Sequence, residues 1–191
     1  VGSEMCIRDS QQLATGHWSR PGGRQHRMIW HQSYRADPKA RDVADRHYNR
    51  QKPGSPQFVP PGRCCVFYAE TDSGRAVWVT SFPFAKYVKH QWGGAWICSA
   101  FRNEGAGIAS EMIRQAVAAT RSALGEPPSL GMVTFIDPRK VRPTKRHGKD
   151  TWGLTYEKAG FHYAGKTKGG LLAFQLLPED MPLAESALPP I

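Results

Sequence analysis

Hydrophobic residues in the middle of the chain form three short runs that alternate with polar turns. Residues 64–69, 76–82 and 95–101 are rich in bulky, β-branched and aromatic side chains, a composition typical of strands. The first two runs flank Thr71-Asp72-Ser73-Gly74, a turn-forming sequence. The pattern therefore predicts an antiparallel hairpin followed by a third strand.

The spacing of apolar residues changes after this third strand. It becomes helical, and one face of the predicted helix carries Ile108, Met112, Ile113 and Ala116. Gly125 and the two prolines after it end the helix near Leu124. The remaining predicted elements are a strand at 131–136, a short helix at 152–158 capped by Gly160, and strands at 161–166 and 171–177. Strands mixed with helices in this way indicate an α/β domain.

The two ends of the chain differ in composition from this predicted core. The N-terminal part is polar and basic, with a helix expected around 39–47 and a proline-rich connector at 52–62. We expect four parts: an extension at 1–10 that resembles a translated adapter sequence and is not native, a basic segment packing on the core at 11–62, the core at 63–178, and a loose tail at 179–191.

Length and composition fit a single globular domain. The chain has 191 residues, 40% of them hydrophobic, which is enough for one core and short for two. No apolar run approaches the roughly 20 residues of a membrane span, so we expect no membrane partner. We expect free thiols in a reducing cytoplasm and no metal site, because no metal-ligand spacing is present among Cys6, Cys64, Cys65 and Cys98.

A glycine-containing segment, Arg102-Asn103-Glu104-Gly105-Ala106-Gly107, joins the third strand to the helix. The first N–H groups of a helix lack intrahelical partners, and the helix dipole places positive potential beside them. Glycines let a ligand approach the backbone closely. The segment therefore predicts an anion site suited to a pyrophosphate, with a purely structural helix start as the alternative.

Two motifs in this part of the chain are similar to those of the GNAT acyltransferases. Arg-x-x-Gly-x-Gly at 102–107 resembles their acyl-CoA pyrophosphate signature, and Tyr156-Glu157-Lys158-Ala159-Gly160-Phe161 resembles the segment that closes their fold. The resemblance covers residues 64–177, with the strand at 131–136 in the expected place. It implies one α/β (α+β) domain with a mixed, mostly antiparallel sheet, splayed between its two central strands and flanked by helices.

In this family acyl-CoA enters the gap between those two strands, which here are 95–101 and 131–136. The resemblance implies acetyl-CoA or another acyl-CoA as the cofactor. It also implies that Arg102 adds charge beside the pyrophosphate. The backbone along the pantetheine arm would be that of Ser99, Ala100 and Phe101, and the amides that hold the pyrophosphate would be those of Gly105, Ala106, Gly107 and Ile108.

The resemblance also suggests catalytic residues. Tyr156 stands where many family members have the tyrosine that protonates the departing thiolate. A phenol with a pKa of about 10 is protonated at neutral pH and can act as this acid, although a packed tyrosine is the alternative. The base has no fixed position in the family. Its candidates here are Asp137, at a predicted strand end, and the pair His47 and Tyr48.

A second resemblance concerns the acceptor. His47-Tyr48, followed by a basic residue and a proline ahead of the core, is similar to the phage Mom proteins, GNAT-like enzymes that modify adenine in DNA. The matching functional positions are His47, Tyr48 and Arg102. This likeness implies DNA as a partner and, for a phage protein, the cytoplasm of a bacterial host.

The net charge favours a polyanionic partner. Lys and Arg number 26 against 16 Asp and Glu, for a formal charge of +10. One basic cluster is interleaved with aromatic residues, which can stack on exposed bases, and another follows 131–136. The candidate DNA-binding residues are Lys86, Lys89, Arg139, Lys140, Arg142, Lys145 and Arg146. The alternatives are a conventional N-acetyltransferase of a small-molecule or protein amine, and a non-catalytic DNA-binding module on the same scaffold.

Overall fold

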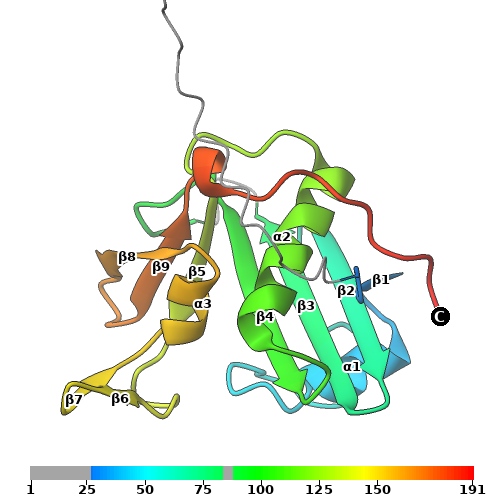
Figure 1. Cartoon of the computed structure of the whole chain (residues 1–191), viewed down its shortest axis with the longest axis horizontal. Helices are drawn as coiled ribbons and strands as arrows, with labels where there is room; N and C mark the ends of the chain where they lie inside the picture. Colours follow the sequence, from blue (N-terminus) through cyan, green and yellow to red (C-terminus); the bar gives the residue numbers. More distant parts are fainter. Residues whose placement is uncertain (1–26, 84–87) are drawn as a thin grey trace, which may run out of the picture.

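A computed structural model of the chain describes residues 27–83 and 88–191. The architecture is mixed α/β (Figure 1) and is built on a seven-stranded sheet with the order β1-β2-β3-β4-β5-β9-β8. Among the named strands of the described residues, β4 and β5 are the one pair that runs in parallel, so the prediction of a mixed, mostly antiparallel sheet flanked by helices is confirmed. The elements are β1 (His31–Ser33), α1 (Pro38–Ala44), β2 (Arg63–Thr71), β3 (Gly74–Phe82), β4 (Trp96–Glu104), α2 (Ala109–Leu124), β5 (Met132–Ile136), β6 (Thr144–Arg146), β7 (Lys149–Thr151), α3 (Leu154–Lys158), β8 (His162–Lys166), β9 (Leu172–Leu176) and the 3-10 turn η2 (Pro178–Asp180).

The predicted hairpin is confirmed as β2 and β3, which pair along all nine residues of each strand. The next strand, β4, is longer than predicted. It continues through Glu104, because Arg102 and Asn103 pair with Val77 and Ala76 of the long neighbouring strand. The first half of the predicted pyrophosphate segment is therefore strand rather than loop.

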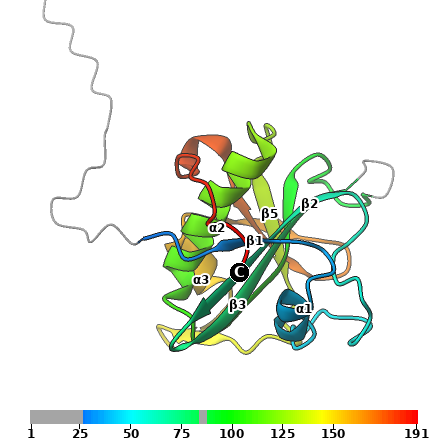
Figure 2. The same cartoon turned by 90° about the vertical axis from the view of Figure 1, so that its right-hand side faces the viewer.

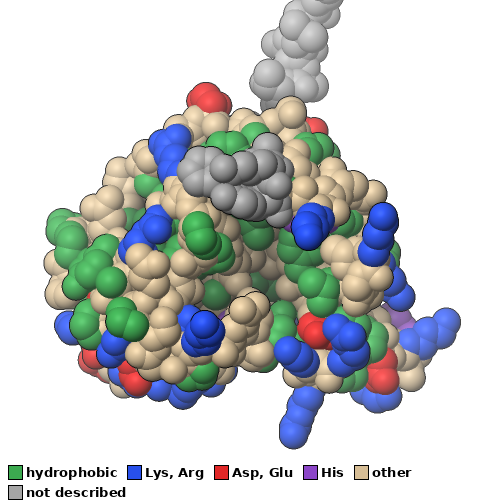
Figure 3. Space-filling model, turned by 180° about the vertical axis from the view of Figure 1, so that it is seen from behind, with side chains coloured by type: hydrophobic (Ala, Val, Ile, Leu, Met, Phe, Trp, Pro, Cys, Tyr) green, Lys and Arg blue, Asp and Glu red, His purple; other side chains and the backbone are tan. Residues whose placement is uncertain are grey.

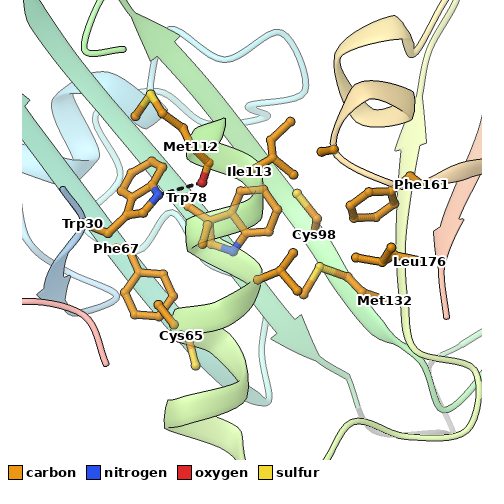
Figure 4. Packing of buried hydrophobic residues seen from close by; sticks show 14 of the residues in the cluster. Trp30, Cys65, Phe67, Trp78, Cys98, Met112, Ile113, Met132, Phe161 and Leu176 are labelled. Carbon is orange, nitrogen blue, oxygen red and sulfur yellow. Dashed lines mark hydrogen bonds between the residues drawn. The ribbon is translucent and has the colours of Figure 1, made fainter. Parts of the chain in front are cut away.

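The two faces of the sheet are covered by different helices. On one face α2 packs on the aromatic core, where the indole N–H of Trp30 donates to the carbonyl of Met112 at 2.8 Å (Figure 4). On the other face Val43 of α1 packs with Val77 and Val79 of β3. Figure 2 shows α1 and α2 on opposite sides of the strands.

Helix α2 ends as predicted, at Gly125, whose φ of 87° only glycine adopts easily. Its predicted buried face is correct for Met112, Ile113 and Ala116. Ile108 is an exception, because it is the N-cap residue rather than part of the helix, and 64% of it is exposed.

The described part of the basic N-terminal segment packs on the core, as expected. Strand β1 pairs with β2, and the side chain of Trp30 is fully buried. Helix α1 ends at Ala44, so His47 and Tyr48 lie after it rather than inside a helix extending to 47. The expectations for residues 1–10 and for Lys86 lie outside the described residues.

The C-terminal tail is not loose, which corrects the expectation for residues 179–191. The amide of Glu185 donates to Ala118 in α2, and the amide of Leu188 donates to Trp30. The carbonyl of Leu188 accepts from Gln32 of β1, and Met181 is buried. The prolines in the tail prevent a helix but leave these backbone groups able to bond.

The basic segment after β5 is also more ordered than the predicted loop. It contains the small hairpin β6–β7, which turns through His147 and Gly148 at positive φ. The indole of Trp152 donates to Val141 and joins this hairpin to the start of α3. Across the parts of the chain described, no helix combines the length and apolar character needed to cross a membrane.

Candidate active site in the fork between β4 and β5

The two central strands pair only briefly and then separate. Their parallel register runs from Trp96 opposite Met132 to Cys98 opposite Thr134. On its other edge β4 carries a bulge at Ser99, because the register to β3 shifts by one residue there. A bulge bends its strand, so it accounts for the divergence of β4 from β5 beyond this point.

Backbone carbonyls that lose their partners at the fork are satisfied by side chains from the N-terminal segment. Asn49 donates from Nδ2 to the carbonyl of Ser99 on β4 at 2.9 Å. The Tyr48 hydroxyl donates to the carbonyl of Phe135 on β5 at 3.2 Å. We call this pair, Tyr48 and Asn49, the crossbar, because it connects the two separated strands.

A cavity of about 360 Å³ lies in the fork and collects most of the residues predicted from the chain's resemblances. A second cavity, of about 430 Å³, lies against the other side of the crossbar and is lined in part by Asp137 and Lys140. Figure 3 shows a hollow between the two halves of the molecule, with Lys and Arg side chains around it. The first cavity is lined by His47, Tyr48, Asn49, Cys98, Ser99, Ala100, Phe101, Arg102, Asn103, Ala109, Thr134, Phe135, Ile136, Val141, Thr155 and Tyr156.

Tyr156 reaches this cavity from α3. Its ring packs edge-on against Phe161 at 5.4 Å between centroids, and its hydroxyl lies 3.7 Å from the thiol of Cys98. Burial is the main cause that raises the pKa of Tyr156 well above its ordinary value, so the phenol keeps its proton at neutral pH. Burial also raises the pKa of the Cys98 thiol to about 12, which makes it a poor nucleophile.

His47 lines the same cavity on the side of the N-terminal segment. Its ring stacks on that of Tyr48 at 4.6 Å, and its Nδ1 lies 2.5 Å from Oδ1 of Asn49. The pKa of His47 is lowered, first by burial and further by the positive charge of Arg102. The imidazole is therefore neutral at pH 7 and able to accept a proton.

Asp137, the other predicted base, has a different environment. It is buried and does not line the cavity that holds Tyr156. Its carboxylate accepts from the backbone N–H of Arg139 and from the guanidinium of the same residue at 2.8 and 3.0 Å. These hydrogen bonds are the main cause that lowers the pKa of Asp137 and make it a weak base.

The glycine turn before α2 differs from the prediction. The side-chain oxygen of Asn103 accepts from the amides of Gly105 and Ala106 at 3.1 and 2.9 Å, so these two amides are already satisfied. Gly107 and Ile108 stand at the start of α2, which no side chain in the described residues caps. None of the four residues lines the cavity. The role of Asn103 could have been predicted from the sequence, because an Asn side chain often accepts a hydrogen bond from the backbone N–H two residues further along the chain.

Arg102 does not stand beside these amides. It pairs with Val77 in the sheet and so points to the face of α1, where its Nε donates to Glu104 at 2.7 Å. Arg46 binds both carboxylate oxygens of Glu104, at 2.8 and 2.7 Å. The hydrogen bond from Arg46 is the main cause that lowers the pKa of Glu104 to about 2. Arg46 was not predicted, because nothing in the sequence shows that α1 ends beside β4.

The predicted DNA-binding residues are only partly brought together. Lys89 is exposed and lies before β4. Three cations of the other cluster form ion pairs, Arg139 with Asp137, Lys145 with Asp150 and Arg146 with Glu157. Lys140 and Arg142 are exposed and form no ion pair within the described ranges. Among the residues that the structure describes, no three or more His, Cys, Asp or Glu side chains are grouped so that they could hold a metal ion.

Comparisons with protein-family models, with curated proteins and with solved structures find no match to this chain.

Proposed function

We propose that the protein is an acyl-CoA-dependent N-acyltransferase with a GNAT-type fold. One observation carries the proposal: the strands that separate after Cys98 enclose a cavity in which a neutral phenol and a neutral imidazole are both present. The first is a proton donor and the second a proton acceptor at neutral pH, which is the pair that amine acylation requires.

The residues around the fork fit an acyl-CoA in part. The part of β4 that no longer pairs with β5, along Ser99, Ala100 and Phe101, lines the cavity and would hold the pantetheine arm, with the Ser99 carbonyl already bonded to Asn49. The uncapped start of α2 lies close by, since Ala109 also lines the cavity, and it would hold the diphosphate. The cavity accommodates the acyl end and not the whole cofactor. When bound, acyl-CoA would supply the activated acyl group.

In this proposal His47 takes the proton that the acceptor amine loses, and Tyr156 supplies the proton that the leaving sulfur needs. The backbone at the fork positions the reactants, which is the larger part of the rate enhancement in such a site. The carboxylate of Asp137 has no part in proton transfer here, because Arg139 holds it in its charged form.

For the acceptor we propose adenine in DNA, by a Mom-like reaction. The support is the +10 charge of the chain together with two exposed cations, Lys140, which lines the second cavity, and Arg142, which follows the first-cavity residue Val141 in the chain. Cations near the fork bind phosphates, and a flipped base could then enter the first cavity, where it would meet His47 beside the aromatic rings of Tyr48 and Phe135.

Calorimetry with acetyl-CoA and thiol-release kinetics test the acyltransferase proposal. The wild-type protein should bind acetyl-CoA with measurable heat. Tyr156→Phe should keep this affinity within about threefold and lose about 10²- to 10⁴-fold in kcat. The matched control is Tyr163→Phe on β8, half exposed and outside the cavity, which should change neither quantity. A protein that gives no heat with acetyl-CoA and other acyl-CoAs is not this enzyme.

Mass spectrometry of nucleosides from cells expressing the protein tests the acceptor. The wild type should produce a new adenine mass, and Tyr156→Phe should not. The slope of log affinity for duplex DNA against log salt should become shallower by about two when Lys140 and Arg142 are both replaced by Gln. Heat with acetyl-CoA but no adenine product indicates a conventional N-acetyltransferase. DNA affinity that falls steeply with salt, without heat from acetyl-CoA, indicates a non-catalytic DNA-binding module.

A further inference from the structure

The side-chain amide of Asn49 has only one orientation that satisfies both of its neighbours. One neighbour is the carbonyl oxygen of Ser99, 2.9 Å from Nδ2, which can only accept a hydrogen bond. Turning the amide over would place its oxygen against this carbonyl, and two acceptors at that distance repel. Nδ2 therefore faces β4, and Oδ1 must face the imidazole of His47.

This orientation decides which nitrogen of His47 carries the proton. Oδ1 of Asn49 accepts only, so the 2.5 Å contact requires a hydrogen on Nδ1. The backbone N–H of Asn49 also lies near Nδ1, at 3.3 Å, and would favour an unprotonated nitrogen. The shorter contact decides the tautomer, because 2.5 Å without a shared proton would be strongly repulsive and 3.3 Å is a weak hydrogen bond at most.

We propose that Asn49 is a positioning residue that holds His47 as its Nδ1–H tautomer, which leaves Nε2 as the proton acceptor in the fork. The inference deepens the proposed function and rests on it for the identity of the reaction. The acceptor nitrogen bonds to the acyl carbon and gives its proton to His47 Nε2. The carbon–sulfur bond breaks, and the sulfur keeps the bonding electron pair and takes a proton from Tyr156.

The crossbar explains how the single side-chain amide of Asn49 can hold the imidazole of His47 in one position. Asn49 is anchored to β4, and the ring of His47 is stacked on Tyr48, which is itself anchored to β5. The imidazole is thus fixed to both branches of the fork. Its position changes only if one of these anchors breaks, so the base is oriented before any ligand binds.

Burial and the charged groups near His47 favour its neutral form and outweigh the hydrogen bonds with Asn49 and with the backbone of Phe101, which raise its pKa. Arg102 faces it from β4, and Tyr48 stacks on it. The carboxylate of Glu104 is neutralised by Arg46 and Arg102. The same cavity is also lined by the un-ionised Tyr156 and Cys98. Together with burial, the positive charge of Arg102 keeps the pKa of His47 below its ordinary value.

Two substitutions separate positioning from general structural support. Asn49→Leu removes both hydrogen bonds while keeping the volume. Asn49→Asp loses the donor to the Ser99 carbonyl as well, but it keeps an acceptor toward Nδ1 and adds a negative charge that favours the imidazolium. The matched control is Gln175→Leu, because Gln175 also donates its amide to a backbone carbonyl, that of Leu130 at 2.9 Å, but lies outside the cavity.

The first readout is the tautomer, from proton–nitrogen correlation spectra of histidine-labelled protein, with the His47 signal assigned by its loss in His47→Gln. The wild type and Gln175→Leu should show the Nδ1–H form at pH 7. Asn49→Leu should lose that preference, and Asn49→Asp should raise the pKa of His47 by about one unit or more. An Nε2–H imidazole in the wild type, or unchanged spectra in both Asn49 variants, would overturn the proposal.

The second readout is the pH profile of kcat/KM with acetyl-CoA and duplex DNA. A base must be neutral to act, so the rate falls below the pKa of His47. In Asn49→Asp this acid limb should move upward together with the pKa from the spectra. In Asn49→Leu the rate should fall about 10²-fold or more at pH 7 while acetyl-CoA affinity is kept. A limb that stays in place while the pKa moves also refutes the inference. A wild type without heat from acetyl-CoA instead refutes the proposed function, and the tautomer spectra still report on Asn49.

Discussion

The two parts of the β4–β5 pair are stabilised in different ways. From Trp96 to Cys98 the strands bond to each other, and the flanking side chains of Trp96 and Met132 are buried. Beyond Cys98 the backbone groups instead bond to side chains of the crossbar, and a cavity opens. In the paired part any apolar residue of the right size would serve. In the open part individual oxygen and nitrogen atoms matter, so substitutions should affect chemistry there more than folding.

Gly131→Ala should have the largest effect, and it should be on stability alone. Gly131 precedes the paired part of β5 with φ of 62°, and a Cβ there would lie 2.0 Å from the carbonyl oxygen of Leu176. We expect a loss of about 3 kcal/mol in the free energy of unfolding, measured by urea titration. Gly148→Ala is the control, with φ of 75° and open space around it, and should cost about 1 kcal/mol. Equal losses would show that the close backbone approach at Gly131 is not rigid.

Asn103→Asp tests the glycine turn at the open end. An aspartate can still accept from the amides of Gly105 and Ala106, so the turn should persist. Its negative charge would oppose a diphosphate at the start of α2, and we expect acetyl-CoA affinity to fall about tenfold at low salt. Calorimetry at two salt concentrations measures this, with Glu111→Gln as a control for charge on the first turn of the helix. An unchanged affinity for acetyl-CoA would show that its diphosphate does not bind at the start of α2.

Tyr48→Phe removes one anchor of the crossbar and keeps the ring. The hydrogen bond to Phe135 is 3.2 Å long and partly buried, so its loss should cost about 1 kcal/mol of stability. The larger consequence should be on the base, because the stacked imidazole loses its connection to β5. We expect kcat to fall by more than this small loss of stability explains, with the urea midpoint moving by less than about 1 M. If stability falls by several kcal/mol and kcat per folded molecule is unchanged, the crossbar is structural only.

How far the sequence predicts this molecule depends on the range of the interactions involved. The β2–β3 hairpin and the end of α2 at Gly125 follow from local turn chemistry and periodicity, and both are correct. The role of Asn103 is also local, but glycines nearby gave the stronger signal. Arg46 and Asn49 could not be predicted, because their partners Glu104 and Ser99 are 58 and 50 residues away in the chain. The prediction of a loose C-terminal tail was wrong for the same reason, since the hydrogen-bond partners of the tail lie on α2, on β1 and at Trp30.

Glu104→Gln should have the smallest effect on stability. This effect can be recognised because it depends on pH. The pKa of Glu104 is lowered from 4.5 to about 2, so its ion pairs stabilise the fold above pH 4.5 and are lost as the pH falls toward 2. Because Arg46 is partly exposed, solvent screening should limit the contribution to about 1 kcal/mol at pH 7. The stability difference between wild type and variant should therefore shrink through this pH window, in urea titrations at each pH. Glu179→Gln, an exposed carboxylate without an ion pair in the described residues, is the control and should leave stability unchanged. A difference that persists at pH 2 would mean that Glu104 acts through shape rather than charge.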